Sequence, residues 1–305
     1  MGVPNAAGYP QYSGTFIPEI WSGTLNEKFY AACCAMAISN SKWEGEIKNA
    51  GDIVHIRQTP DITIRDYNKN QAIEVENPEA GIIDLVVDKA KYFAFTCDDI
   101  DRYQADVALM DDWGNDAGQQ MKIVVDKDVF ANIYADVAAT NKGSTAGAIT
   151  AGFSLGVTGT PIQITKSTVL DYIVDLGTVL DESNVPETDR WLTIPAWMGG
   201  MIKKSDLKDA SITGDGKSIL RNGRIGIIDR FELYLSNNLA VVSDSGHNCF
   251  HALAGHKSAF TFAAQMTNME TLRSERTFGD VVRGLNVYGY KTVIPNALAD
   301  LYCYK

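Results

Sequence analysis

Apolar and small residues recur at steps of three or four between Asp98 and Ala139, at positions 103, 107, 110, 114, 117, 121, 125, 129, 133 and 137. This spacing places them on one face of an α-helix. Asp98 or Asp99 is a suitable N-cap, and negative charge in the first turn suits the helix dipole. A helix of roughly 38 residues, at about 1.5 Å per residue, is about 55 to 60 Å long. The pattern therefore predicts one long amphipathic helix that serves as a spine.

The segment before this helix contains the short apolar runs that are typical of β-strands. The runs are 53–57, 62–64, 72–75, 82–87 and 92–95, and together they predict extended hairpins. The polar segment 65–71 lies between the second and third runs and is rich in turn-forming residues. We predict that it forms the tip of a hairpin, a tip with no obvious core of its own.

Residues 1 to about 48 contain a single helical candidate, Thr24–Ile38, and otherwise a stretch rich in glycine, proline and tyrosine. Phe16, Ile17 and Trp21 belong to that stretch, and apolar side chains outside regular structure stay exposed unless something covers them. We therefore predict an arm whose apolar residues are covered by a neighbouring subunit.

The chain after the spine helix begins with a glycine-rich loop, 141–159, and then alternates helix and strand. This alternation predicts a compact α/β unit followed by closing strands. The predicted helices are 167–182 and 196–204, and the predicted strands are 191–195, 225–228, 231–235, 251–262, 285–293 and 301–304.

Charge and composition exclude several classes of protein. The chain has 305 residues, 27 basic against 38 acidic, and a formal net charge of −11, which argues against nucleic-acid binding by bulk charge. No stretch approaches the roughly 18 apolar residues of a membrane helix, and the start lacks the pattern of a secretory signal. Five cysteines, without metal-type spacing, fit a reducing cytosol.

The motif Gly152-Phe153-Ser154-Leu155-Gly156 matches G-x-S-x-G, in which a sharp turn between strand and helix exposes a nucleophilic serine. The segment 157–161 ends in proline and cannot begin the helix that this turn requires. A serine hydrolase that uses Ser154 is therefore the least favoured of the alternatives, and we predict no catalytic residue.

Two further motifs are weighed against structural interpretations. The segment 214–218 resembles the end of a phosphate-binding loop, but Ser211 stands where the motif needs its first glycine. His247, Cys249 and His251, with His256 beyond, would share a strand face, yet residues two apart on a strand lie about 6.5 to 7 Å apart, too far for adjacent zinc ligands. We expect a turn and a half-buried strand, with no metal and no cofactor.

Three segments carry a more specific signal than these motifs: YQADVALMDDW at 103–113, NVPETDRWL at 184–192 and RGLNVYGY at 283–290. With them, the order of arm, long hairpin, spine helix, α/β unit and closing strands resembles the major capsid protein of tailed bacteriophages, over essentially the whole chain. That family has the Hong Kong 97-type fold. The resemblance implies an α+β fold with an N-terminal arm at 1–48, an extended loop at 49–97, a peripheral domain at 98–160 and 269–305, and an axial domain at 161–268.

The resemblance also implies the function and the partners. Pentamers and hexamers would close an icosahedral virion shell around double-stranded DNA, without sequence-specific binding, in the host bacterial cytoplasm. The partners would be further copies of the chain, a portal protein, a separate scaffolding protein and a decoration protein; a non-viral shell of the same fold is the alternative. The expected contacts between subunits lie on the arm and the loop tip: Phe16, Ile17, Trp21, Arg65, Asp66, Tyr67 and Lys69.

Overall fold

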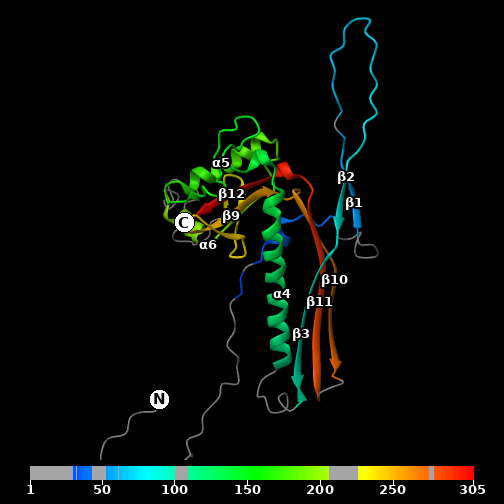
Figure 1. The fold of residues 1–305 in the computed structure, drawn as a ribbon, viewed down its shortest axis with the longest axis vertical. Helices are drawn as coiled ribbons and strands as arrows, with labels where there is room; N and C mark the ends of the chain where they lie inside the picture. Colours follow the sequence, from blue (N-terminus) through cyan, green and yellow to red (C-terminus); the bar gives the residue numbers. More distant parts are fainter. Residues whose placement is uncertain are drawn as a thin grey trace, which may run out of the picture.

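The structure is a computed structural model that describes residues 30–31, 33–42, 53–60, 62–99, 109–205, 226–274 and 278–305, with the backbone alone at 109–111 and 265–267. Three parts are arranged around helix α4, Leu109–Ile133 (Figure 1). A compact body lies beside the C-terminal end of the helix, a long sheet runs along it, and a two-armed loop stands beyond the end of that sheet. The α+β architecture predicted from the sequence is thus present.

The body is built on a seven-stranded mixed sheet with the order β4-β12-β9-β5-β7-β6, in which β8 also pairs with β9. Its helices are α5, Val169–Glu182, and α6, Ala196–Lys204. The strands are β4 Ile162–Gln163, β5 Arg190–Ile194, β6 Ile227–Ile228, β7 Phe231–Leu235, β8 Val241–Asp244, β9 His247–His256 and β12 Leu298–Tyr304.

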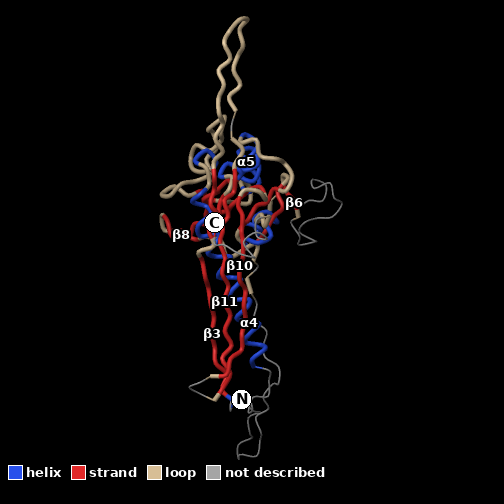
Figure 2. Tube along the Cα trace, turned by 90° about the vertical axis from the view of Figure 1, so that its right-hand side faces the viewer, coloured by secondary structure: helices blue, strands red, loops and turns tan. Residues whose placement is uncertain are grey.

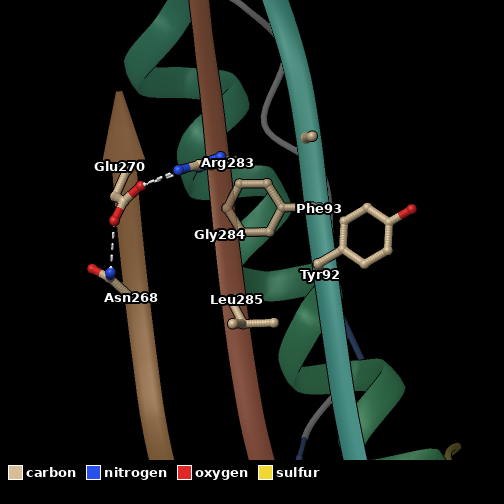
Figure 3. A pocket seen from close by; sticks show the side chains of 8 residues that line it. Tyr92, Phe93, Asn268, Glu270, Arg283, Gly284 and Leu285 are labelled. Atoms are coloured by element: carbon tan, nitrogen blue, oxygen red, sulfur yellow. Dashed lines mark hydrogen bonds and ion pairs between the residues drawn. The ribbon is translucent and has the colours of Figure 1, made fainter. Parts of the chain in front are cut away.

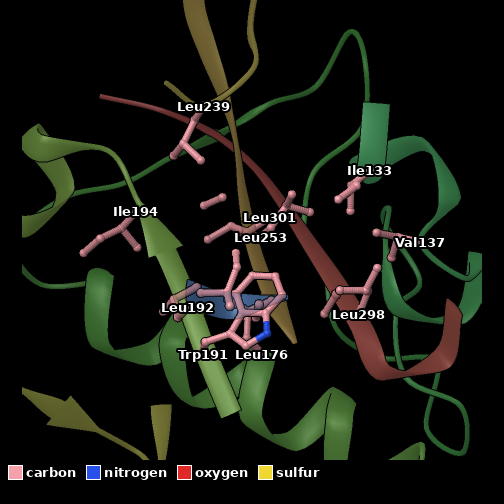
Figure 4. Packing of buried hydrophobic residues seen from close by; sticks show 14 of the residues in the cluster. Ile133, Val137, Leu176, Trp191, Leu192, Ile194, Leu239, Leu253, Leu298 and Leu301 are labelled. Carbon is pink, nitrogen blue, oxygen red and sulfur yellow. The ribbon is translucent and has the colours of Figure 1, made fainter. Parts of the chain in front are cut away.

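The core of the body is apolar because its central strands are covered on both faces. Every residue of β5 is buried, as expected for a strand covered on both sides. Its two polar residues have partners: Arg190 pairs with Asp181 at 2.7 Å, and the hydroxyl of Thr193 donates to Leu253 O at 3.0 Å. Trp191 packs edge-on against Phe260 with ring centroids 6.0 Å apart. Figure 4 shows Leu176 from α5 beside Trp191 and Leu192, and Leu298 and Leu301 on the side of Ile133 and Val137.

The long sheet contains β3 Lys89–Asp98, β11 Gly279–Thr292 and β10 Phe260–Arg273, in the antiparallel order β10-β11-β3. Figure 2 shows these strands side by side, with the loop above them. The strand β3 alternates between half-buried and exposed residues, as a strand covered on one face should. Phe95 on the covered face meets Trp113 of α4 at 5.9 Å between centroids.

Polar contacts also fasten α4 to the long sheet. Asp128 of α4 accepts hydrogen bonds from Lys89 Nζ at 3.0 Å and from the hydroxyl of Tyr288 at 3.0 Å. Lys89 also lies over the ring of Tyr290, 4.5 Å from its centroid. These hydrogen bonds lower the pKa of Asp128, although burial alone acts in the opposite direction.

Several predicted bounds need correction. The spine helix ends earlier than predicted, because α4 stops at Ile133 and two short 3₁₀ turns follow. At its predicted start, Asp98 is the last residue of β3 and Asp99 is helical, and 100–108 lie outside the described residues. The predicted helix Thr24–Ile38 is helical in the described residues only from Ala35 to Ile38, as α1. Tyr30, Ala31 and Cys33 lie outside any helix or strand.

Two strand predictions also need correction. The predicted strand 251–262 is two strands, since β9 ends at His256 and β10 starts in a different sheet at Phe260. The runs 62–64 and 72–75 form no strand. The strands predicted near 53–57, 82–87, 191–195 and 231–235 and the helices near 167–182 and 196–204 are present, with small shifts at their ends. The strand predicted at 285–293 is also present, but it begins six residues earlier, at Gly279.

Candidate functional site

The two-armed loop begins as a regular hairpin. The strands β1, Ile53–Arg57, and β2, Ile82–Val86, are antiparallel, with Ile53 opposite Val86 and Arg57 opposite Ile82. One further backbone hydrogen bond, from Gln58 N to Gly81 O at 2.8 Å, extends the same register. The base is anchored because Ile56 and Leu85 pack with Val87, Ala263 and Val293 in a small separate core.

Above Gly81 the two arms keep this register through side chains. The amide of Thr63 donates to Glu76 Oε1 at 2.7 Å, and the guanidinium of Arg65 pairs with Glu74 and lies 4.0 Å from Glu76. At the tip, Gln71 N donates to Asn68 O at 2.9 Å. Among the described loop residues 62–80, this turn is the only backbone hydrogen bond, so the arms face each other in register without a β-ladder.

The register divides the loop into two faces. In a hairpin, residues opposite each other share a face and successive residues alternate. Thr63, Arg65, Glu74 and Glu76 therefore lie on one face, which is polar and ion-paired. The other face carries four aliphatic side chains, with exposed fractions of 65% for Ile62, 91% for Ile64, 80% for Ile73 and 91% for Val75. We call these four residues the apolar loop face.

The contact residues predicted at the tip are all at the surface of the loop. Arg65 is ion-paired with Glu74, Tyr67 is 66% exposed, and Asp66 and Lys69 are exposed. Phe16, Ile17 and Trp21 of the predicted arm lie outside the described residues. The apolar loop face is not predicted from the sequence above. Its signal is the alternation of aliphatic and polar residues in 62–65 and 73–76, which a fully polar tip would lack.

A second exposed apolar surface lies on the long sheet, on the side opposite α4, which we call the outer sheet face. A hollow of about 400 Å³ there is lined in part by Tyr92, Ala94 and Leu285. Tyr92 is 79% exposed and Leu285 is 38% exposed. Arg283 and Glu270 also line this hollow (Figure 3), and Arg283 donates to Glu270 at 2.7 and 3.0 Å, which lowers the pKa of that carboxyl.

The catalytic and metal alternatives find no support in the geometry. Ser154 is exposed in an irregular loop that continues into a turn at 157–160, so the nucleophile elbow is not formed. Among the residues that the structure describes, no three histidine, cysteine, aspartate or glutamate side chains cluster as metal ligands. The glycine motif at 214–218 lies outside the described residues. Within the described part of the chain, no helix is long and apolar enough for a bilayer.

The histidines of β9 have structural partners instead. His251 is stacked on Tyr134 at 3.9 Å between centroids, and its Nδ1 lies 2.8 Å from Asp300 Oδ2. Asp300 is buried, and burial raises its pKa. His247 is stacked on Tyr304, and His256 Nδ1 lies 2.7 Å from Ser258 Oγ. His247, His251 and His256 all belong to β9, so the prediction that they share one strand is confirmed.

A comparison with protein families identifies the chain. A model described as "Phage capsid protein" matches residues 83–301, more than two-thirds of the chain. The chain belongs to this family. It is a structural component of the virion capsid that assembles with copies of itself into an icosahedral shell, and its family is not one of enzymes. No curated protein matches this capsid protein.

Solved structures share the fold of this capsid protein over nearly its full length. A structure from Mycobacterium phage Che8 is 27% identical with a TM-score of 0.78, and the match covers 94% of this chain and 97% of that one. The capsid of cyanophage P-SCSP1u is 13% identical, with a TM-score of 0.69 and coverage of 95% and 94%. The capsid of a native GTA particle is 12% identical, with a TM-score of 0.65 and coverage of 96% and 97%.

Proposed function

We propose that this capsid protein forms pentamers and hexamers, and that these capsomers close the shell around double-stranded DNA. The observation that carries the proposal is the extended loop, which stands away from the body with four aliphatic side chains exposed. An exposed apolar surface of this kind on a projecting element marks a protein contact. A contact between two different surfaces of identical copies is heterologous, and such contacts generate rings when the rotation closes.

The domain assignment follows the sheets. We propose an arm at 1–48, an extended loop from 49 to the residue before β3, a peripheral domain of the spine helix with the long sheet, which includes β3, and an axial domain of the body that begins near 161. The boundary expected at 268/269 falls within β10, and β12 pairs with β9 in the body sheet. We therefore assign 298–304 to the body and all of β10 to the peripheral domain.

Further partners fit the charge of the chain and the resemblance. A formal net charge of −11 disfavours tight phosphate binding, so packaged DNA would be enclosed without sequence-specific contact and could leave again. We propose a portal protein at one vertex, a separate scaffolding protein during assembly in the host bacterial cytoplasm, and a decoration protein on the finished shell.

The experiment is to produce the chain alone and together with a scaffolding protein encoded beside it, and to examine both by sedimentation and negative-stain electron microscopy. We expect closed shells or rings with five-fold and six-fold symmetry in at least one preparation. A monodisperse monomer in both would contradict the proposal. The cargo of shells purified from infected cells then decides between a virus, which encloses DNA, and a non-viral shell, which encloses protein.

A further inference from the structure

The root of the extended loop crosses strand β11 at a glycine. Gly289 of β11 lies opposite Ala263 of β10, and we call these two residues the root notch. A Cβ atom at Gly289 would overlap the carbonyl oxygen of Val86 and lie 2.9 Å from the Cα atom of Val87. Val86 is the last residue of β2. The backbone that leads from the loop into β3 is therefore in direct contact with the backbone of the long sheet.

The root notch is small because space is needed there. Glycine within a strand weakens it, and it often marks the close approach of another backbone. Gly289 does not have the positive φ that requires glycine at Gly156. Ala263 is 0% exposed and packs with Ile56 and Leu85 of the hairpin. The lack of larger side chains at both positions thus lets the base of the loop lie close against the sheet.

The sheet side of this contact is fixed more firmly than the loop side. Tyr288 and Tyr290, on either side of Gly289 in the chain, each donate a hydrogen bond of 3.0 Å to Asp128 of α4. Tyr288 is also buried and belongs to the main core. The loop is anchored by its small separate core, and a two-stranded hairpin is at best marginally stable alone. An atom added in the root notch would therefore move the loop and leave the sheet in place.

A small shift at the root becomes a large one at the tip. Carbon atoms in contact are about 3.5 to 4.0 Å apart, so a Cβ atom at Gly289 would displace Val87 by roughly 1 Å. Leu85 is buried and lies roughly 7 Å from Val87 along the strand, so this shift tilts the loop about Leu85. The arm from Leu85 to the turn at Gln71 is roughly 45 Å long at the rise of a strand. The same tilt would move the tip by roughly 5 to 7 Å.

We propose that Gly289 is a positioning residue for assembly, and that the root notch sets the direction in which the extended loop leaves its subunit (Figure 1). A closed ring repeats the same contact with the same rotation at every subunit. A loop that projects in another direction brings its apolar face to another place on the neighbouring copy, and the rotation no longer closes. This inference rests on the proposed function, and it concerns how the loop is held on its own subunit.

The first experiment measures the direction of the loop in free subunits. Spin labels are placed at the tip, on Lys69→Cys, and in turn on Lys166→Cys or Lys257→Cys of the body, because all three lysines are exposed. Two body positions detect a displacement in more than one direction. Cys33→Ser removes the exposed native thiol, and the other four cysteines are buried. The distances between the labels are measured by double electron–electron resonance.

We expect Gly289→Ala to change at least one of the two mean distances by about 4 Å or more. Gly284→Ala is the matched control in the same strand, because its added Cβ atom would meet the ring of Phe93 instead of the backbone of the loop. Its distances should equal those of the parent protein within the error of the measurement. Unchanged distances in Gly289→Ala would overturn the proposal.

The second experiment measures assembly and stability together. Gly289→Ala should lower the yield of sedimenting shells at least tenfold, whereas Gly284→Ala should stay within about threefold although it also costs stability in urea. Ala263→Val narrows the root notch from the opposite strand and should lower the yield as strongly, so it decides the test if Gly289→Ala does not fold. Losses of yield that follow stability alone in all three variants would overturn the proposal. A wild type that forms no shells would overturn the proposed function, whereas the distances in free subunits still test the root notch.

Discussion

The body buries its aliphatic side chains, whereas the extended loop exposes them to solvent. Leu192 and Ile194 in the body are 0% exposed, whereas Ile64 and Val75 in the loop are each 91% exposed. Burial of an aliphatic side chain contributes roughly 1.5 to 3 kcal/mol. The body gains this stabilisation when a single subunit folds. The loop gains it only when it contacts another subunit in the shell. The difference separates residues that fold the subunit from residues that join subunits.

The sharpest way to test this division is to remove a side chain that packs into the core of the body from the start of β10. Phe260 is fully buried and packs against Trp191, so Phe260→Ala should lower the free energy of unfolding of the isolated subunit by about 3 to 5 kcal/mol. Urea titration followed by tryptophan fluorescence measures this. Ile64→Ala is the control and should stay within about 0.5 kcal/mol of the wild type. Similar losses from both variants would erase the distinction.

The body was also the part that the sequence predicted well. Helix 196–204 is found with its predicted ends, because its apolar spacing and the proline before it act locally. The predicted strand 251–262 is in fact β9 and β10, which are separated by a turn at Lys257 and Ser258. The turn was missed because apolar residues on both sides of it suggest one continuous strand. The late end of the spine helix was wrong because the apolar spacing continues to Val137, whereas the backbone is already extended at that residue.

The loop shows why the candidate site was only partly predictable. A tip at 65–71 follows from local turn chemistry, and the structure has its turn at Asn68–Gln71. The runs 62–64 and 72–75 were predicted as strands from β-propensity, which does not act without a packed surface. The exposed face they form depends on register, and register is set at β1 and β2, several residues away.

A second effect concerns the place where the N-terminal segment joins the body. Asp126 of α4 is buried and accepts hydrogen bonds from Cys34 N at 3.1 Å, Ala35 N at 2.8 Å and Asn238 Nδ2 at 2.8 Å. Asp126→Ala leaves these donors unsatisfied and should cost about 2 to 4 kcal/mol. Hydrogen exchange should rise at Ala35–Ile38 more than at β5, and uniform exchange in both would contradict this local role.

The same carboxyl gives a pH dependence with a defined sign. Burial raises the pKa of Asp126 above its ordinary value of 3.8. The folded state therefore holds this proton more tightly than the unfolded state, so its contribution is greatest below pH 3.8 and is lost as the pH rises through the folded pKa. Relative to Asp126→Asn, the wild type should lose stability from about pH 4 upward. Urea titrations at several pH values measure the difference in free energy of unfolding between the wild type and Asp126→Asn. A difference that does not change with pH would contradict the prediction.

A smaller effect is expected where the long sheet meets its helix. A Cβ atom at Gly284 would lie 2.3 Å from Cε1 of Phe93, and the ring would have to move. Gly284→Ala should therefore cost about 1 to 3 kcal/mol. Gly118 of α4 has no neighbouring atom within 4 Å of such a position, so Gly118→Ala should instead stabilise by about 0.5 to 1 kcal/mol. Thermal unfolding of both variants measures the contrast, and equal signs would contradict it.

The smallest effect on the isolated subunit should come from the largest change in sequence. Gln58 and Gly81 are joined by a backbone hydrogen bond, so replacing 59–80 with Asn-Gly closes the hairpin with a two-residue turn in the existing register. The small core around Ile56 and Leu85 is untouched, and unfolding should change by less than about 0.5 kcal/mol. Assembly should nevertheless be lost, because the apolar loop face is gone. Shells of normal yield from this variant would show that the loop, although exposed, does not join the subunits.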